Sequence, residues 1–127
     1  MAGLIMREAH YPGKAAIEAY GNMGFRFAGM SHRGSILCLP SGIHGWAATD
    51  AALLTVADFA KAIEEIGGID VMLVGTGLEP YPLPRELRAK LREAGLKAEI
   101  MTTSAAVSTF NILVEEQRNV AAALIAV

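Results

Sequence analysis

The chain has 127 residues, of which 53% are hydrophobic and 19% are charged, and its 11 basic residues stand against 13 acidic ones. A chain of this length can bury enough surface for one core, so we expect a single domain over residues 1–127 that needs no disulfide. The near-balanced charge argues against nucleic-acid binding, and no apolar run reaches the roughly 20 residues that cross a bilayer, which argues against membrane insertion.

The N-terminal region and the single cysteine indicate a cytoplasmic protein. Arg7, Glu8 and Lys14 interrupt the apolar residues of segment 1–20, so we expect no signal peptide or transit helix there. We expect residues 1–14 to be poorly ordered. Cys38 cannot form an internal disulfide, which favours a reducing compartment, and its apolar neighbours predict a buried thiol.

Short extended segments with turn signals between them occupy the first part of the chain. Apolar and polar residues alternate in Phe25-Arg26-Phe27, and an apolar run covers residues 35–40. Residues that favour turns cluster at 21–24 and at 31–34. A further short segment, 43–48, contains the only tryptophan. These segments predict a small N-terminal antiparallel β meander.

Helical and strand patterns alternate in the rest of the chain. We predict helices at 55–66, 85–94 and 102–117, and strands at 69–74, 97–101 and 120–127. The Rossmann-like alternation of strand and helix from residue 69 predicts an α/β sheet flanked by helices. We expect both connecting helices on one face, with the first helix and the meander on the other.

Two small polar turns form the main candidate ligand site. Gly75-Thr76-Gly77 and Thr102-Thr103-Ser104 each follow a predicted strand, and ligands of parallel α/β sheets bind beyond the carboxyl ends of strands. The second turn begins a helix, where free amides and the helix dipole favour a carboxylate or phosphate. The alternative, which we favour, is ordinary capping of the helix by a hydroxyl.

Asn111 is a further candidate, because the predicted helix 102–117 can turn this side chain partly inward. It either faces the same crevice as a ligand donor or bridges the helix to a neighbouring loop, and the second interpretation is favoured because buried amides usually serve structure. Arg26 lies on the exposed side of its strand, where a guanidinium can bind a partner carboxylate or remain solvated.

The motifs of common catalytic and cofactor sites are absent from the sequence. There is no Gly-x-Ser-x-Gly elbow for a nucleophile, no Gly-Lys-Ser/Thr phosphate loop and no complete dinucleotide fingerprint. The histidines are too widely spaced to suggest a zinc site: His10, His32 and His44. We therefore predict no catalytic residue, no metal and no cofactor.

Several segments together resemble a known family. They are Gly24-Phe25-Arg26-Phe27, Gly34-Ser35-Ile36-Leu37, Trp46, Val74-Gly75-Thr76-Gly77, Met101-Thr102-Thr103, Thr109-Phe110-Asn111 and Val120-Ala121-Ala122-Ala123-Leu124-Ile125. The chain is similar to a small single-domain family of largely uncharacterised bacterial and archaeal proteins, whose mitochondrial relatives assist assembly of respiratory complex I. The resemblance implies a three-layer α/β fold with a mixed central sheet.

Two hypotheses of function follow. The leading one is a non-enzymatic accessory or assembly-type protein that binds a protein partner through an exposed patch near Phe25, Phe27 and Trp46, with Arg26 beside them. The alternative is a small-anion or metabolite-binding protein or enzyme that uses the crevice at Thr76 and Thr102–Ser104. A homodimer is compatible with either hypothesis.

Overall fold

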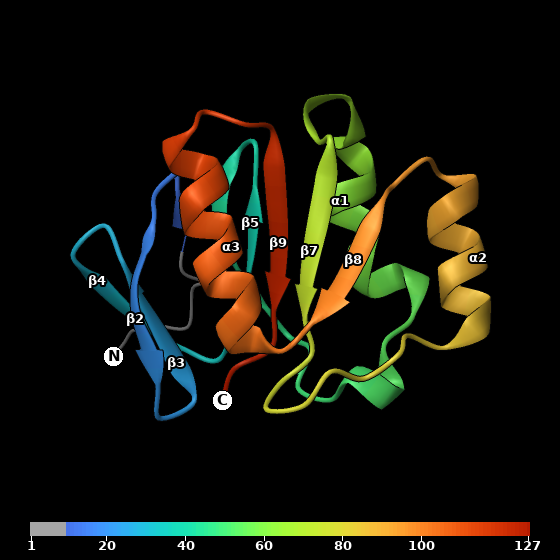
Figure 1. Ribbon diagram of the computed structural model, residues 1–127, viewed down its shortest axis with the longest axis horizontal. Helices are drawn as coiled ribbons and strands as arrows, with labels where there is room; N and C mark the ends of the chain where they lie inside the picture. The colour runs from blue at the N-terminus through green and yellow to red at the C-terminus, as the bar shows by residue number, and fades with distance from the viewer. Residues whose placement is uncertain (1–9) are drawn as a thin grey trace, which may run out of the picture.

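A six-stranded mixed sheet forms the centre of the computed structural model, which describes residues 10–127 (Figure 1). Its strands lie in the order β1-β6-β5-β9-β7-β8. They are β1 His10–Tyr11, β5 Ser35–Leu39, β6 Gly42–Trp46, β7 Val71–Gly75, β8 Ala98–Met101 and β9 Val120–Leu124. The last strand, β9, runs antiparallel to β5 and parallel to β7, so it joins the N-terminal hairpin to the α/β half.

The predicted meander is divided between two sheets. Strands β2 Ile17–Gly21, β3 Gly24–Phe27 and β4 Met30–Arg33 form a separate three-stranded antiparallel sheet, here called the small sheet. The predicted turn at 31–34 is wrong in part, because β4 covers most of it. The chain turns instead at Ala28 and Gly29, with φ of 50° and 73°.

The helices agree with the predicted segments, except for a short 3₁₀ turn at 51–53 that the sequence pattern does not predict. They are the 3₁₀ turns η2 Ala51–Leu53, η3 Val56–Phe59 and η4 Ile66–Gly68, and the α-helices α1 Ala60–Glu64, α2 Arg85–Glu93 and α3 Thr103–Glu115. Thr55 and Asp58 form a capping box at the start of η3. No helix among residues 10–127 is long and apolar enough to cross a membrane.

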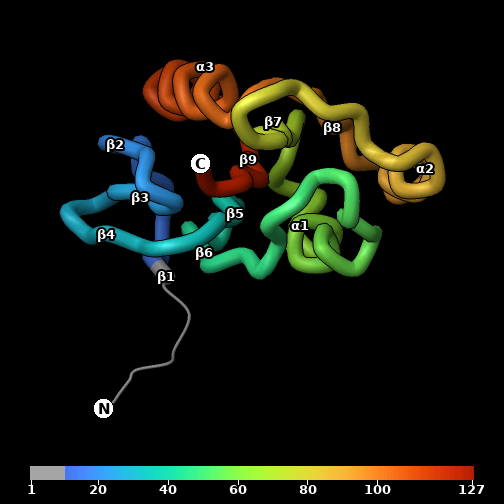
Figure 2. The backbone as a smooth tube through the Cα atoms, turned by 90° about the horizontal axis from the view of Figure 1, so that it is seen from below, coloured from blue at the N-terminus to red at the C-terminus, as the bar shows by residue number. Residues whose placement is uncertain are grey.

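The connecting helices α2 and α3 lie on opposite faces of the main sheet, which corrects our expectation that they share one face. Strand β8 lies outside β7, whereas β9 lies on the other side of β7, so the two right-handed crossovers run in opposite directions across the sheet. Figure 2 shows α3 on one side of the sheet and α1 on the other. The result is a three-layer fold with a mixed central sheet.

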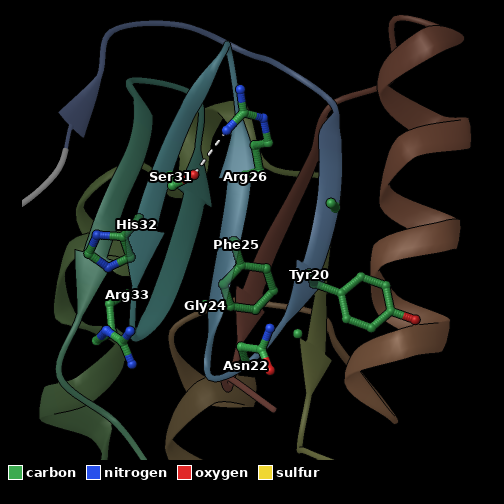
Figure 3. A pocket seen from close by; sticks show the side chains of 10 residues that line it. Tyr20, Asn22, Gly24, Phe25, Arg26, Ser31, His32 and Arg33 are labelled. Carbon is green, nitrogen blue, oxygen red and sulfur yellow. Dashed lines mark hydrogen bonds between the residues drawn. The ribbon is translucent and has the colours of Figure 1, made fainter.

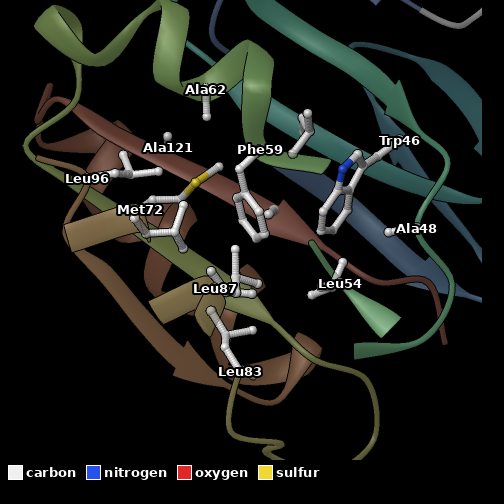
Figure 4. Packing of buried hydrophobic residues seen from close by; sticks show 14 of the residues in the cluster. Trp46, Ala48, Leu54, Phe59, Ala62, Met72, Leu83, Leu87, Leu96 and Ala121 are labelled. Atoms are coloured by element: carbon white, nitrogen blue, oxygen red, sulfur yellow. The ribbon is translucent and has the colours of Figure 1, made fainter. Parts of the chain in front are cut away.

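Each face of the main sheet has its own core. The α1/α2 cluster includes Trp46, Phe59, Met72 and Leu87 (Figure 4). The α3 cluster joins that helix to the small sheet, and it includes Ile17, Phe25, Phe27, Cys38, Val107 and Phe110. Alternate β9 alanines belong to different clusters, Ala121 and Ala123 to the first and Ala122 to the second. Small side chains there allow both layers to approach the sheet closely.

The expectation of poor order at 1–14 falls mainly on residues 1–9, which lie outside the described residues. Within the described part, His10 and Tyr11 pair with His44 and Ile43 of β6. The C-terminal end is also held, since the carbonyl of Val127 accepts a hydrogen bond from the amide of Met23 at 2.7 Å.

Candidate functional site

The two small turns meet at the carboxyl ends of the neighbouring strands β7 and β8, as the sequence predicts. The amide of Thr103 donates to the carbonyl of Gly77 at 2.9 Å, and the amide of Thr76 donates to the carbonyl of Met101 at 2.9 Å. Gly75 is the closest point, because a Cβ there would lie 2.8 Å from the Cα of Thr103. The backbones of the two turns are therefore tied directly to each other.

Thr103 is fully buried and its hydroxyl is used within the chain. It donates to the carbonyl of Ile125 at 2.7 Å and accepts a hydrogen bond from the amide of Gly77 at 3.0 Å. This threonine thus joins three elements, the end of β7, the start of α3 and the segment after β9. A buried hydroxyl with both roles filled is a structural group rather than a ligand donor.

The other two threonines also bond to the backbone. The Thr76 hydroxyl accepts from the amide of Tyr81 at 2.9 Å and donates to the carbonyl of Glu79 at 2.8 Å. The Thr102 side chain accepts from the amide of Ala105 at 3.1 Å, which is the N-cap of α3. The capping interpretation of Thr102 is confirmed, and the Thr76 hydroxyl both donates and accepts within the chain.

Helix α3 is linked to the small sheet by side-chain hydrogen bonds. Asn111 accepts from the amide of Ile17 at 2.8 Å and donates to its carbonyl at 2.9 Å. The Ser104 hydroxyl accepts from the phenol of Tyr20 at 2.7 Å. Both partners belong to β2, so the interpretation of Asn111 as a structural bridge is confirmed, although its partner is a strand rather than a loop.

The expected exposed patch at Phe25, Phe27 and Trp46 is wrong. The exposed fractions of these residues are 3%, 0% and 9%. The alternation in β3 turns both phenylalanines toward the α3 cluster, while Trp46 donates its indole N–H to the carbonyl of Asp58 at 2.8 Å and contacts the ring of Phe59 edge-on. These three aromatic residues hold the layers together.

Arg26 remains accessible, and it borders an open groove on the outer face of the small sheet (Figure 3). The groove has a volume of about 440 Å³. We call it the arginine groove, and its lining consists of Ala19, Tyr20, Gly21, Asn22, Gly24, Phe25, Arg26, Ser31, His32 and Arg33. These residues belong to all three strands of the small sheet and to the turn between β2 and β3.

The groove has an excess of positive charge. Arg26 donates to the Ser31 hydroxyl at 3.0 Å, and its Nε lies 3.5 Å from a carboxylate oxygen of Glu18. Arg33 forms no ion pair with any residue of the described range 10–127. The Nε2 of His32 lies 3.2 Å from the carbonyl of Ser35, so this nitrogen carries a proton.

Gly24 allows β3 and β4 to lie close together beside the groove. A Cβ at this position would lie 2.6 Å from the carbonyl oxygen of His32, so any side chain would displace the adjacent strand. The two guanidinium groups that line this groove, of Arg26 and Arg33, can bind carboxylate oxygens in pairs. The sequence pattern does not reveal Arg33 as a site residue, because residues 31–34 resemble a turn and Met30-Ser31-His32-Arg33 carries only a weak strand signal.

Cys38 is a core residue, as predicted. Its exposed fraction is 2%, and burial raises the pKa of its thiol well above the ordinary range. A thiol in this state is a poor nucleophile. Within residues 10–127, no group of three or more His, Cys, Asp or Glu side chains could hold a metal ion.

The fold and groove describe a three-layer α/β protein whose accessible polar site lies on a small antiparallel sheet. Residues 17–125 match the family described as "Protein of unknown function (DUF498/DUF598)", and the chain belongs to this family. An uncharacterized protein of Rhodobacter capsulatus is 36% identical over 119 residues, which are 94% of this chain and 90% of the relative.

Two further relatives bear on structure and function. The crystal structure described as an outer membrane protein from Bartonella henselae is 53% identical, with a TM-score of 0.87 over 92% of this chain and 98% of that one. The NADH dehydrogenase (ubiquinone) 1 alpha subcomplex assembly factor 3 of Mus musculus is 28% identical over 93% of this chain. The present chain spans 64% of that mouse protein, which is therefore considerably longer.

Proposed function

We propose that this chain is a non-enzymatic accessory protein that binds a partner protein during assembly of a larger complex. The observation that carries the proposal is its similarity, over most of its length, to assembly factors of NADH dehydrogenase from several vertebrates. The internal use of the Thr76 and Thr103 hydroxyls supports the same conclusion, because both donate to backbone carbonyls and are lost as donors to the competing ligand-binding hypothesis. The single cysteine supports a cytoplasmic location.

The arginine groove is the contact surface that we assign to this function. Arg26 and Arg33 lie on adjacent strands and on the same outer face, since Arg26 pairs with Ser31 and Gly24 pairs with Arg33. A rigid sheet holds both guanidinium groups, which reduces the conformational entropy lost on binding. We therefore expect the partner to present one or more carboxylates to this face.

The test is complementation of a deletion strain of the source organism. Loss of the gene should lower the amount of assembled NADH dehydrogenase, measured on native gels, and the wild-type chain should restore it. The double variant Arg26→Gln/Arg33→Gln should fail to restore it while keeping the wild-type unfolding midpoint. Arg85→Gln, on the exposed side of α2, is the matched control and should restore assembly fully.

Two outcomes would count against the proposal. Unchanged NADH dehydrogenase in the deletion strain would remove the assembly role. Full restoration by Arg26→Gln/Arg33→Gln would keep that role but move the contact surface away from the arginine groove.

A further inference from the structure

The edge of the main sheet at β8 offers backbone hydrogen-bonding groups that no strand among the described residues uses. β8 is the last strand in the sheet order, and its partner β7 covers one side only. The carbonyl of Lys97 accepts a hydrogen bond from the amide of Met72 in β7, and the carbonyl of Met101 accepts one from the amide of Thr76. Because successive residues of a strand point their backbone groups to opposite sides, Ala98 and Ile100 direct theirs toward the open side.

A groove runs beside this edge, between β8 and α2, and we call it the edge groove. Figure 1 shows α2 lying alongside β8. The groove has a volume of about 370 Å³. Its apolar part consists of Leu83, Leu91, Leu96, Ala98 and Ile100, and its charged part consists of Arg88, Arg92 and Lys97. No acidic residue lines it.

We propose that the edge groove binds an extended acidic segment of a partner protein, which adds to the main sheet as a strand beside β8. Added strands gain affinity from main-chain hydrogen bonds and specificity from pockets for alternate side chains. The open backbone groups of Ala98 and Ile100 supply the main-chain hydrogen bonds. The apolar and basic side chains that line the groove supply the contacts to alternate side chains. This surface is separate from the arginine groove and independent of the proposed function.

The arginine spacing suits a strand. Arg88 and Arg92 are four residues apart on α2, which places them about 6 Å apart along the helix axis. Alternate side chains of an extended segment are about 6.6 Å apart. Two acidic residues on the same face of an added strand can therefore each meet one arginine. An apolar residue two positions further along the same face would contact Leu91 or Leu96.

The charge pattern favours a foreign acidic segment over a second copy of this chain. A symmetric dimer through β8 would bring the same three basic residues of both copies to one interface: Arg88, Arg92 and Lys97. Like charges brought together in this way weaken association. An acidic partner removes the repulsion and pairs the same groups.

The test uses a fluorescent probe peptide, acetyl-Ser-Glu-Thr-Glu-Thr-Leu-Ser-amide, whose alternate residues are Glu, Glu and Leu, so that the two carboxylates have the spacing of Arg88 and Arg92. Binding to the full chain is followed by anisotropy, and amide shifts in nuclear magnetic resonance should locate it at Ala98 and Ile100. Replacing both Glu by Lys should weaken binding about tenfold or more. Arg88→Gln/Arg92→Gln should do the same, whereas the control Arg85→Gln/Lys90→Gln, on exposed positions outside the groove, should not.

Strand addition has a sharper signature in the probe itself. Only alternate amides of an added strand face β8, so N-methylation of one alternate set should abolish binding while the other set is tolerated. The two probes carry N-methyl groups either on Leu and the second Glu or on the two Thr. Equal effects of the two probes, no binding of the unmodified probe, or a dimer of the wild-type chain through β8 would each overturn the proposal.

Discussion

Single polar residues of this protein connect layers rather than face a ligand. Asn111 shows this most clearly, since its amide makes two hydrogen bonds with one residue, Ile17, which is 94 positions away in the sequence. The hydroxyl of Thr103, at the start of α3, likewise donates to the carbonyl of Ile125 in the segment after β9. Residues that look like site residues in the sequence are therefore the residues on which attachment of α3 depends.

Replacement of Asn111 by leucine should destabilise the fold. Asn111→Leu keeps the size of the side chain but leaves the amide and carbonyl of Ile17 without partners, so we expect a loss of about 1–3 kcal/mol in the free energy of unfolding. Urea unfolding followed by circular dichroism measures it. Ile112→Ala is the control on the same helix, because Ile112 is 57% exposed, and it should change the stability little. A wild-type midpoint for Asn111→Leu would contradict the bridging role.

At the scale of elements, α3 packs on β7 without room for another atom. The nearest atoms to a Cβ built on Gly75 are the Cα of Thr103 at 2.8 Å, its hydroxyl oxygen at 3.1 Å and the Cβ of Ala106 at 3.2 Å. The first contact is to backbone, which cannot rotate away. The glycine is thus a packing requirement, and its position before Thr76 does not imply a phosphate-binding loop.

Gly75→Ala should therefore force β7 and α3 apart. Overpacking of this kind usually costs about 1–3 kcal/mol, and we expect a fall of that size in the free energy of unfolding. Gly67→Ala is the matched control, since nothing lies within 4 Å of a Cβ at that position, and its effect should be within about 0.5 kcal/mol. Chemical denaturation of the two variants side by side makes the comparison, and equal midpoints would refute close packing at Gly75.

At the scale of the whole molecule, the two clusters share one sheet. Neighbouring residues of β9 face opposite sides, and each of these alanines is fully buried. Loss of one layer would expose that face of the sheet and remove the support of the other layer. We therefore expect the chain to unfold as one cooperative unit.

The chain carries one natural reporter in each cluster. Trp46 belongs to the α1/α2 cluster and Cys38 to the α3 cluster, and each is the only residue of its type. The urea midpoint of Trp46 fluorescence should coincide with the midpoint at which Cys38 reacts with a thiol reagent given as a short pulse. Distinct midpoints would show that the two layers unfold separately.

Local patterns in the sequence were sufficient to predict most helices and strands. They were not sufficient to predict how these elements are arranged in space. Helical spacing and turn residues predicted the three α-helices and the strands from β5 onward, and the two small turns meet as expected. The outer face of the small sheet escaped prediction, because the strand character of Ser31 and His32 depends on pairing with β3 rather than on their own propensity.

The sequence by itself determined the α/β class, the order of helices and strands, the buried state of Cys38 and the cap at Thr102, because each follows from residues close together in the chain. Only the tertiary structure decided which face each helix covers, that Phe25, Phe27 and Trp46 are buried, and that Arg26 and Arg33 share a groove. These features depend on the order of strands in the sheet, which arises from contacts between segments far apart in sequence.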